Sequence, residues 1–445
     1  MRKAKVLKWV MMGALALTVM SGTGNCAEAA KGTVSITKKN FPCKELRAEL
    51  KKWYDLNDDG KLTKSEARRI TSIQISTGLR SRKKISLKGM KYLTNLKSVH
   101  IFAGNVCNLD LSHNKKLKSI DIGANNVTGL KFSGNRLENF SISAEGKVKG
   151  NLSFKNFKKL RNVYFEMGAF DSVDFSGSSV QSISDGNYVV SMKKLKLTNC
   201  KKLRRLDLTP FDMKSLDIKG TTGFRVLNIN TEAVRKIDVS KMKNLRELSL
   251  RGASITKLSV KKNKKLEKLN VSGTKIKTLD LSANNKLEVL RYGDNKRITK
   301  MFAIPHPERI KILDISKTKI AKVNLSKYTA VQELHLSALP ITTLDLKNCK
   351  KISYLYVNDT KKLKTLDLSA QTKLENIELS RSNVEELDIR NSLLVCDHDE
   401  GGSGIGLSDC KKLRKIIVNK ELKELKDFQD SAKQDGLNIE WVTIQ

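Results

Sequence analysis

Apolar residues recur at a fixed interval along most of the chain, and polar residues fill the positions between them. Between residues 245 and 290, Leu245, Leu266 and Leu287 stand 21 residues apart. Each unit of 21 holds two half-repeats, L-x-x-L-x-V-x-x-T-x-I and I-x-x-L-x-L-x-x-N-x-x-L, and their second leucines follow one another at alternating steps of 10 and 11 residues. The L-x-L alternation predicts short strands whose leucines face one side. The chain should therefore form stacked coils, with two short parallel strands in each coil and little helix.

This pattern resembles the leucine-rich repeat, L-x-x-L-x-L-x-x-N/C-x-L, and the resemblance implies a solenoid. The Asn/Cys position of the second half-repeat holds Asn114, Cys200, Asn263, Asn284, Cys349, Gln371 and Cys410. We expect these side chains to satisfy backbone groups of the neighbouring coil, which makes the three cysteines buried thiols. A disulfide between Cys396 and Cys410 is the one bridge that stays open as an alternative.

About fifteen coils fit between residues 85 and 420, and at about 4.8 Å per coil they predict a rod about 70 Å long. Residues 140–195 break the register, which indicates either a longer insertion or distorted coils. Stacks of this kind need capped ends. We assign the caps to residues 31–84 and 421–445, with Trp53 and Trp441 as their apolar closures.

The first 30 residues have the pattern of a signal peptide. A basic segment precedes a short apolar run from Trp9 to Met20, and the small residues Ala27 to Ala29 offer a cleavage site. The apolar run is shorter than the roughly 20 residues that span a membrane. Cys26 leaves lipid attachment as an alternative to cleavage. We expect an exported chain, secreted or held at the cell surface, with no transmembrane segment after cleavage.

The chain carries a formal net charge of +39, and removal of residues 1–29, with four Lys or Arg and one Glu, leaves +36. Such a charge predicts affinity for anionic surfaces or polymers. Lysine pairs recur directly after the Asn/Cys position, so they should stack into a lysine edge along one corner of the coils. The pairs are Lys115 and Lys116, Lys158 and Lys159, Lys201 and Lys202, Lys264 and Lys265, Lys350 and Lys351, and Lys411 and Lys412.

The segment DLNDDGKLTKSE, residues 55–66, matches the calcium-loop pattern D-x-[DN]-x-[DN]-G-x5-E in full. Calcium prefers oxygen ligands, and the sharp turn at the sixth loop position needs a glycine, here Gly60. Apolar residues at helical spacing precede the loop, and a second helix can begin after it. The predicted Ca²⁺ ligands are Asp55, Asn57, Asp59, the Lys61 carbonyl, Thr63 through a water, and Glu66.

An EF-hand-like segment followed directly by leucine repeats is similar to the start of bacterial secreted leucine-rich repeat proteins of the internalin-like class. The residues that carry this resemblance run from Phe41 to Ile101 and continue into the repeats. The resemblance implies a non-enzymatic surface or interaction protein. It does not identify the ligand. We also expect a monomer, and we expect the single calcium loop to stabilise the cap on the first coil.

The outward residue between the two strand aliphatics differs between the half-repeats. One column is nearly uniform, which is typical of scaffold: Asp217, Asp238, Ser259, Asp280, Asn324, Asp345, Asp367 and Asp388. The other column is varied, as a recognition surface would be: Tyr164, Asp207, Asn228, Ser249, Asn270, Arg291, Asp314, His335, Tyr356 and Glu378. Because Arg and aromatic residues contribute most of the energy at interfaces, Arg291, His335, Tyr354 and Tyr356 form the predicted ligand face.

Three function classes remain open. The first is specific protein binding at the varied column. The second is charge-driven binding of an anionic cell-wall or host polysaccharide along the lysine edge. The third and most remote is a hydrolase, for which only Asp397, His398, Asp399 and Glu400 form a candidate cluster. The chain lacks the usual catalytic motifs, and no motif indicates specific nucleic-acid recognition.

Overall fold

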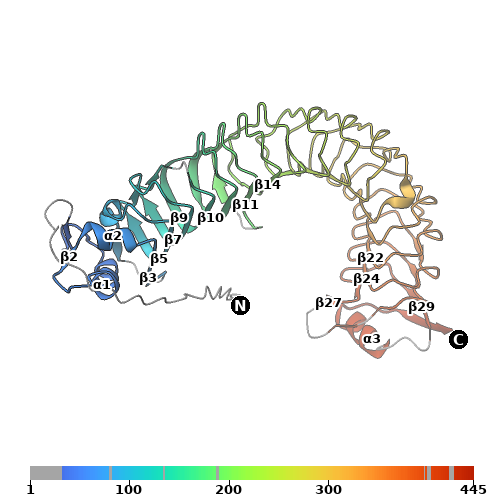
Figure 1. The fold of residues 1–445 in the computed structure, drawn as a ribbon. Coiled ribbons are helices and arrows are strands. Elements are labelled where there is room, and N and C mark those ends of the chain that lie inside the picture. The colour runs from blue at the N-terminus through green and yellow to red at the C-terminus, as the bar shows by residue number, and fades with distance from the viewer. Residues whose placement is uncertain are drawn as a thin grey trace.

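The stack of coils bends into an arc. The computed structural model describes residues 33–79, 83–133, 136–186, 190–394, 396–397, 402–419 and 425–444. Figure 1 shows the coils following one another around an arch, with a small helical unit at each end. The predicted leucine-rich repeat solenoid, with parallel strands and little helix, is confirmed. The predicted rod is bent into this arc.

In the described residues, sixteen strands pair in parallel, one coil after another, on the inner, concave side of the arc. They are β3 (Ser72–Gly78), β5 (Ser98–Cys107), β7 (Ser119–Thr128), β9 (Asn139–Ser153), β10 (Asn162–Asp174), β11 (Ser182–Ser184), β14 (Arg205–Leu208), β16 (Val226–Ile229), β17 (Glu247–Ser249), β18 (Lys268–Asn270), β19 (Val289–Arg291), β20 (Ile312–Asp314), β21 (Glu333–His335), β22 (Tyr354–Tyr356), β24 (Asn376–Glu378) and β28 (Ile405–Gly406).

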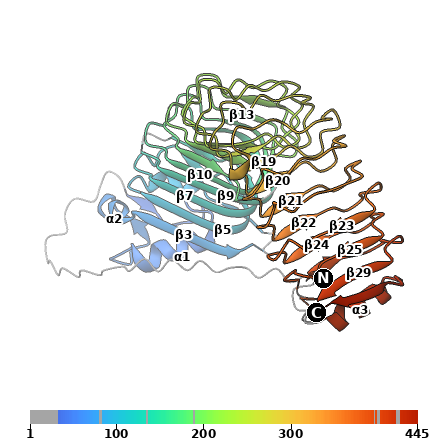
Figure 2. The same ribbon diagram turned by 90° about the vertical axis from the view of Figure 1, so that its right-hand side faces the viewer.

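Strands on the remaining sides of the coils are fewer. Some flank the long strands of the N-terminal coils: β4 (Lys84–Ser86), β6 (Asp110–Leu111), β8 (Lys131–Phe132) and β12 (Val190–Met192). On the outer side, β13 (Lys194–Lys196) pairs with β15 (Ser215–Asp217). Near the C-terminus, β23 (Thr365–Asp367), β25 (Glu386–Asp388), β29 (Lys415–Asn419) and β30 (Glu440–Ile444) form a second parallel sheet. Figure 2 shows this outer layer beside β22 and β24. A two-stranded hairpin, β26 (Cys396–Asp397) with β27 (Gly402–Ser403), projects between coils.

Two strands per coil therefore occur only toward the ends of the arc. Residues 218–364 are all described, and their only strands belong to the concave ladder. Paired strands must lie about 4.8 Å apart. The outer side of an arc is longer than its inner side, so neighbouring segments there are too far apart to pair. The curvature of the solenoid thus accounts for the loss of strand pairing on its outer side.

Residues 140–195 form distorted coils. The long strands β9 and β10 pair with register shifts, one of them between Phe165 and Met167. Both strands continue toward the outer side, where Val173 of β10 pairs with Leu195 of β13. The irregular spacing of this region reflects wider, bulged coils of the same solenoid.

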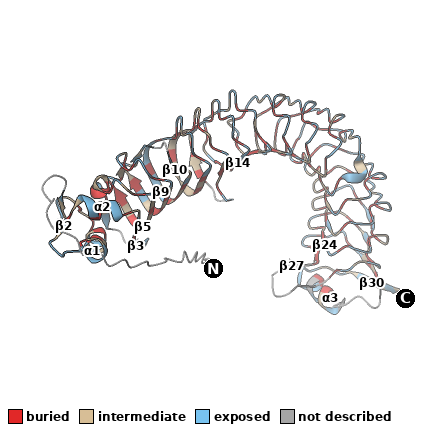
Figure 3. Ribbon diagram, viewed as in Figure 1, coloured by how far each residue is buried: buried red, intermediate tan, exposed pale blue. Residues whose placement is uncertain are grey.

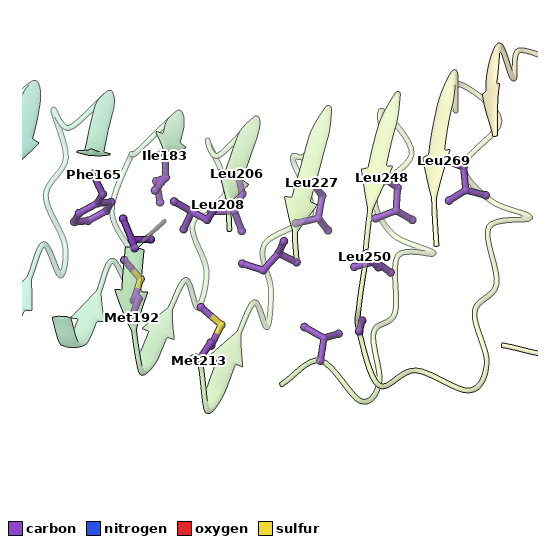
Figure 4. Packing of buried hydrophobic residues seen from close by; sticks show 14 of the residues in the cluster. Phe165, Ile183, Met192, Leu206, Leu208, Met213, Leu227, Leu248, Leu250 and Leu269 are labelled. Atoms are coloured by element: carbon purple, nitrogen blue, oxygen red, sulfur yellow. The ribbon is translucent and has the colours of Figure 1, made fainter. Parts of the chain in front are cut away.

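The core is a single band of aliphatic rows inside the coils. Strand register aligns Ile183, Leu206, Leu227, Leu248 and Leu269, and all five are buried. Figure 4 shows these side chains following one another from coil to coil, and Figure 3 shows buried residues along the inside of the coils throughout the arc. Each buried leucine contributes about 1.5–3 kcal/mol before chain entropy is subtracted.

The Asn/Cys position forms the predicted polar ladder beneath this core. Asn263 donates from Nδ2 to the carbonyls of Val239 and Met242 at 2.9 Å, and Asn284 donates to those of Val260 and Asn263 at 3.2 and 3.1 Å. Asn114 and Gln371 make equivalent bonds to earlier coils. The amide oxygens of these four side chains accept no hydrogen bond from the described residues. The side chain at the Asn/Cys position therefore has to supply only a hydrogen-bond donor.

This requirement explains why cysteine can replace asparagine. Cys200, Cys349 and Cys410 are buried free thiols whose Sγ atoms point at the carbonyls of Phe175, Leu325 and Leu379. Burial raises the pKa of Cys349 to about 11. A thiol is a weak donor, and these thiols are protonated and unreactive at neutral pH. The three predicted buried thiols are confirmed, while the side chain of Cys396 lies outside the described residues.

Helices cover both ends of the stack. At the N-terminal end, α1 (Lys44–Trp53) buries Leu46 and Leu50 against the first coil, and the short α2 (Lys64–Arg69) follows it. At the C-terminal end, α3 (Leu425–Gln434) buries Phe428, and β30 adds the last strand. Trp441 is half-buried against the core, as an apolar closure would be. Trp53 is 63% exposed, so its predicted role as an apolar closure is wrong.

We predict that Asn284→Ala lowers the free energy of unfolding by roughly 1–3 kcal/mol, because two carbonyls each lose one of their two hydrogen bonds and keep only the one to a backbone N–H. Asn284→Cys should cost less, since the thiol keeps a weak donor. Urea unfolding followed by circular dichroism measures both changes. Asn285→Ala, at an exposed neighbouring position, is the control and should stay within about 0.5 kcal/mol of the unmodified chain. Equal losses in the Ala and Cys variants would contradict the donor argument.

Candidate functional site

The varied column lies on the concave face in strict register. Pairing aligns Asp207 with Asn228, and the same alignment continues through Arg291 and His335 to Glu378. The sequence left open which broad face is concave. The strands that carry this column lie on the inner side of the arc, whereas β29 and β30 lie on the outer side (Figures 1 and 3).

Arg291 and His335 both contact the carboxylate of Glu333, which is not one of the predicted ligand-face residues. Glu333 Oε1 accepts from Arg291 Nη2 at 3.0 Å and from His335 Nε2 at 2.6 Å. All three side chains are only 22–31% exposed, so solvent screens their interaction less than at an open surface. Donation to a carboxylate places the His335 proton on Nε2. The carboxylate holds an arginine from β19 and a histidine from β21 in fixed positions.

Aromatic rings extend this cluster along β22. The rings of His335 and Tyr356 stack with centroids 4.2 Å apart and an interplanar angle of 7°. Burial, followed by the charges of Glu333 and Glu378, raises the pKa of Tyr356, so its hydroxyl stays protonated at neutral pH. Tyr354 is 43% exposed on the same strand. The structure thus brings together all four predicted ligand-face residues on two neighbouring strands and on β19.

The concave surface is hollowed beside this cluster. Two adjoining hollows of about 410 and 470 Å³ share Asn270 and Arg291 in their linings. Polar side chains line part of both hollows, with Asn228 and Glu247 in the first and Asp314 in the second. Asn228 donates to Glu247 at 2.6 Å. The hollow surface therefore offers fixed donors and acceptors next to the aromatic cluster.

The uniform column has a structural role that explains its composition. Each acid accepts the backbone N–H two residues further on and closes the turn after the outer segment, as Asp280 does from Ser282 and Asp345 from Lys347. Asn324 makes the same bond to Ser326. Such Asx turns favour Asp and Asn at one position. The prediction that this column is scaffold agrees with these contacts.

The lysine edge lies at the turns that follow the ladder position. Its residues are exposed, and among the described ion pairs only that of Lys411 with Asp409, at 4.0 Å, involves one of them. Lys116 and Lys265 donate to asparagines of the preceding coil at 2.6 and 2.8 Å. The lysine stripe is interrupted, because the corresponding turn of one coil holds Thr222 and Gly223.

The predicted calcium loop connects α1 to α2. Asp55 accepts the amides of Asp59 and Gly60 at 3.1 and 2.9 Å, and Gly60 has a φ of +72°. Strand β2 (Lys61–Leu62) within the loop pairs antiparallel with β1 (Val34–Ser35). The loop is therefore held by a strand pair with β1, which precedes α1 in the chain.

Glu66 is held at the end of this loop. Its carboxylate accepts the amides of Leu56 and Thr63 at 2.8 Å each, and Thr63 caps α2 in return. Burial raises the pKa of Glu66, but these hydrogen bonds together lower it by more. The pKa of Glu66 therefore lies below its ordinary value. Asn57 is exposed. In the described part of the chain, no three His, Cys, Asp or Glu side chains lie close enough together to hold a metal ion. The oxygen ligands suit calcium, and the site stays a prediction.

Several predicted features fall on residues that are not described. The predicted signal peptide, with Cys26, and the residues His398, Asp399 and Glu400 lie outside the described ranges. Across the described ranges, no helix has the length and apolarity that crossing a membrane requires.

Sequence reasoning missed Glu333, the residue that joins the ligand face. A signal for it was present, because in the strand Glu333–His335 both residues flanking the buried leucine point outward. The varied column takes the outward position after the buried leucine, whereas Glu333, the partner of Arg291 two coils away, occupies the outward position before it.

Comparison with known proteins supports the fold. No family model matches the sequence, and no curated protein matches it. Among solved structures, the functional domain of InlJ from Listeria monocytogenes, described as including a cysteine ladder, has a TM-score of 0.55 at 18% identity, over 88% of this chain and 76% of that one. A leucine-rich repeat protein of Leptospira interrogans has a TM-score of 0.51 at 15% identity, over 85% and 98%. These likenesses show the solenoid fold alone.

We predict that the turn carboxylates make stability depend on pH. Hydrogen bonds from Ser369 lower the pKa of Asp367. A lowered folded pKa gives stability above the unfolded value of about 3.9 that is lost as pH falls. Asp367→Asn keeps the acceptor without the charge, so the stability gap between the two chains should shrink from about pH 5 to pH 2.

The reciprocal variant provides the control. Asn324 makes the same contact to Ser326, and Asn324→Asp should make acid unfolding steeper. Urea midpoints at each pH measure both effects. A gap that does not change with pH in either variant would contradict the role of these turns.

Proposed function

We propose that this chain is an exported, non-enzymatic binding protein that recognises a protein partner with its concave face. The observation that carries the proposal is the cluster in which Glu333 fixes Arg291 and His335 while His335 stacks on Tyr356. Side chains held in place before binding lose little entropy when a partner docks. Tyr and Arg are the residues that most often dominate interface energies.

The shape of the surface favours a macromolecular partner. The concave ladder presents one column of outward residues across many coils, and its hollows are shallow features of that long face. Solenoids use such extended concave surfaces for binding. The fold neighbours are compatible with this role, which for this chain rests on the cluster itself.

The lysine edge supports a second candidate, charge-driven retention on an anionic cell-wall or host polysaccharide. Its lysines are exposed and, Lys411 excepted, lack ion-pair partners among the described residues. The net charge of +39 also favours binding of an anionic polymer to the surface as a whole. The two candidates separate by salt, because contacts to polyanions weaken steeply as ionic strength rises.

We also propose that residues 55–66 bind Ca²⁺ and so stabilise the N-terminal cap. Asp55, Asn57, Asp59, the Lys61 carbonyl, Thr63 and Glu66 would hold the ion. The support is the complete loop pattern, the turn at Gly60, and a carboxylate at Glu66 already placed beside the start of α2. The ion would neutralise acids at the end of the stack.

We predict that the triple variant Arg291→Ala, Tyr354→Ala and Tyr356→Ala binds its partner at least roughly 30-fold more weakly, since hot-spot losses reach 2 kcal/mol or more. Residues 31–445 would be titrated against intact cells, their extracted surface proteins, teichoic acid and heparin, at ~50 and ~300 mM salt. Binding to one protein that survives ~300 mM salt and is lost in the triple variant is the expected result.

The matched control carries Lys257→Ala, Lys277→Ala and Lys322→Ala, three exposed residues outside the concave strands. It should bind the protein partner normally. Binding that disappears at high salt, and that the concave triple variant retains, would reject protein recognition and assign the function to the lysine edge.

We predict that millimolar Ca²⁺ raises the melting temperature of residues 31–445 and that Asn57→Ala abolishes the rise. Asn57 is exposed at the third loop position and makes no described hydrogen bond, so its removal should leave the apo protein unchanged. Asp58→Asn is the control, because the fourth loop position does not ligate calcium and asparagine tolerates its φ of +54°. Calorimetry that detects no calcium binding would reject the site.

A further inference from the structure

A crevice opens on the outer side of the arc, away from the concave face. It has a volume of about 770 Å³ and lies between residues 216–222 of one coil and 233–242 of the next. Its apolar lining includes Leu216, Ile218 and Ile237, which are only partly buried. This volume lies within the roughly 300–1,000 Å³ range of ligand sites.

The crevice opens where the polar ladder is interrupted. In the following coils, Asn263 donates to carbonyls 24 and 21 residues earlier, those of Val239 and Met242. The residue that should serve the carbonyls of Ile218 and Thr221 in this way is Met242, which has no donor. Met242 lines the crevice, so the two coils lack the side-chain bond that draws other pairs together.

The crevice also borders an unpaired strand edge. β15 pairs with β13 on one side, and it is the last strand of that outer ladder. Among the described backbone bonds, none joins residues 215–219 to residues 233–240. Ser215 N–H is turned toward the preceding coil, where it donates to the Lys193 carbonyl. The backbone groups of Leu216, which alternate in direction, are turned toward the crevice.

The rim of the crevice is basic. Lys219, Arg235, Lys236 and Lys241 line it, with Asp238 as the one acid. None of the four cations takes part in a described ion pair. Four cations and one acid line the crevice, so an anionic occupant would meet a net positive charge beside the apolar floor.

We propose that this crevice binds an extended acidic peptide segment of a partner, which adds a strand to the free edge of β15. Aliphatic side chains on one face of that strand would fill the floor, and acidic side chains on the other would meet the rim. Strand addition takes its affinity from main-chain bonds and its specificity from alternate side chains. An acyl chain could fill the floor but would leave the strand edge unpaired. The site is separate from the concave face and does not depend on its function.

The test uses a blocked, fluorescent hexapeptide of alternating glutamate and valine, titrated into residues 31–445. Companion probes are the lysine–valine and glutamate–serine hexapeptides and decanoate. Only the glutamate–valine peptide should bind, and Ile237→Glu should weaken it at least tenfold. Leu258→Glu, at the same half-buried position one coil further on and outside the crevice, should leave binding unchanged.

A second pair of variants guards against a misfolded Ile237→Glu protein. Arg235→Glu with Lys236→Glu reverses two exposed charges and should also weaken binding at least tenfold, whereas Lys257→Glu should not. No binding of the glutamate–valine peptide, equal binding of the lysine–valine peptide, or equal losses in the matched controls would overturn the proposal. Displacement of the peptide by decanoate at lower concentration would reassign the crevice to acyl chains.

Discussion

Backbone pairing along the concave side is the constraint on which the rest of the structure depends. Sixteen described strands, from β3 to β28, stay paired in parallel along this side. The pairing persists even where the coil length changes from 21 to 23 residues, as between Leu290 and Leu313. Hydrogen bonds fix the separation of neighbouring coils there at about 4.8 Å. Every other side of a coil must adapt to that spacing, and the outer side does so by giving up its strands over residues 218–364.

The ladder beneath the core supplies what the outer side loses. A solenoid coil must turn sharply after each strand, and its turning carbonyls are buried between coils. Asn263 and Asn284 each satisfy two of them from the next coil, so the stack stays joined where strands do not pair. Because each of these bonds joins two coils, a residue without a donor at this position, Met242, leaves its coil without that link to the preceding coil, and the crevice lies there. Curvature and the ladder together decide where the solenoid is closed and where it is not.

The period of the sequence predicted the coils, the buried thiols and the alignment of the varied column, because each follows from one residue's place within 21. The features it missed arise between coils. Curvature is a property of the whole stack. Glu333 reaches Arg291 across two coils, and although the strand pattern shows that Glu333 points outward, it does not show which side chain of another coil Glu333 contacts. Trp53 lies on the exposed side of α1, where Lys52 approaches its ring at 4.8 Å, although its helical spacing suited a closure. Composition alone could not distinguish these sides.

The positions of the acidic residues follow from the same difference between the outer and the concave side of the coils. In so basic a chain, most positions with a repeated acid serve the fold: the outer column closes turns, as Asp280 and Asp345 do, and this role excludes them from varying. On β20 of the concave column, Asp314 closes the same kind of turn by accepting the amide of Ser316 at 3.0 Å. Arg291, His335 and Tyr356 instead contact other side chains, so these positions can hold arginine, histidine and tyrosine without loss of the scaffold. The recognition that we propose for the concave face would thus follow from where the solenoid does not need its side chains.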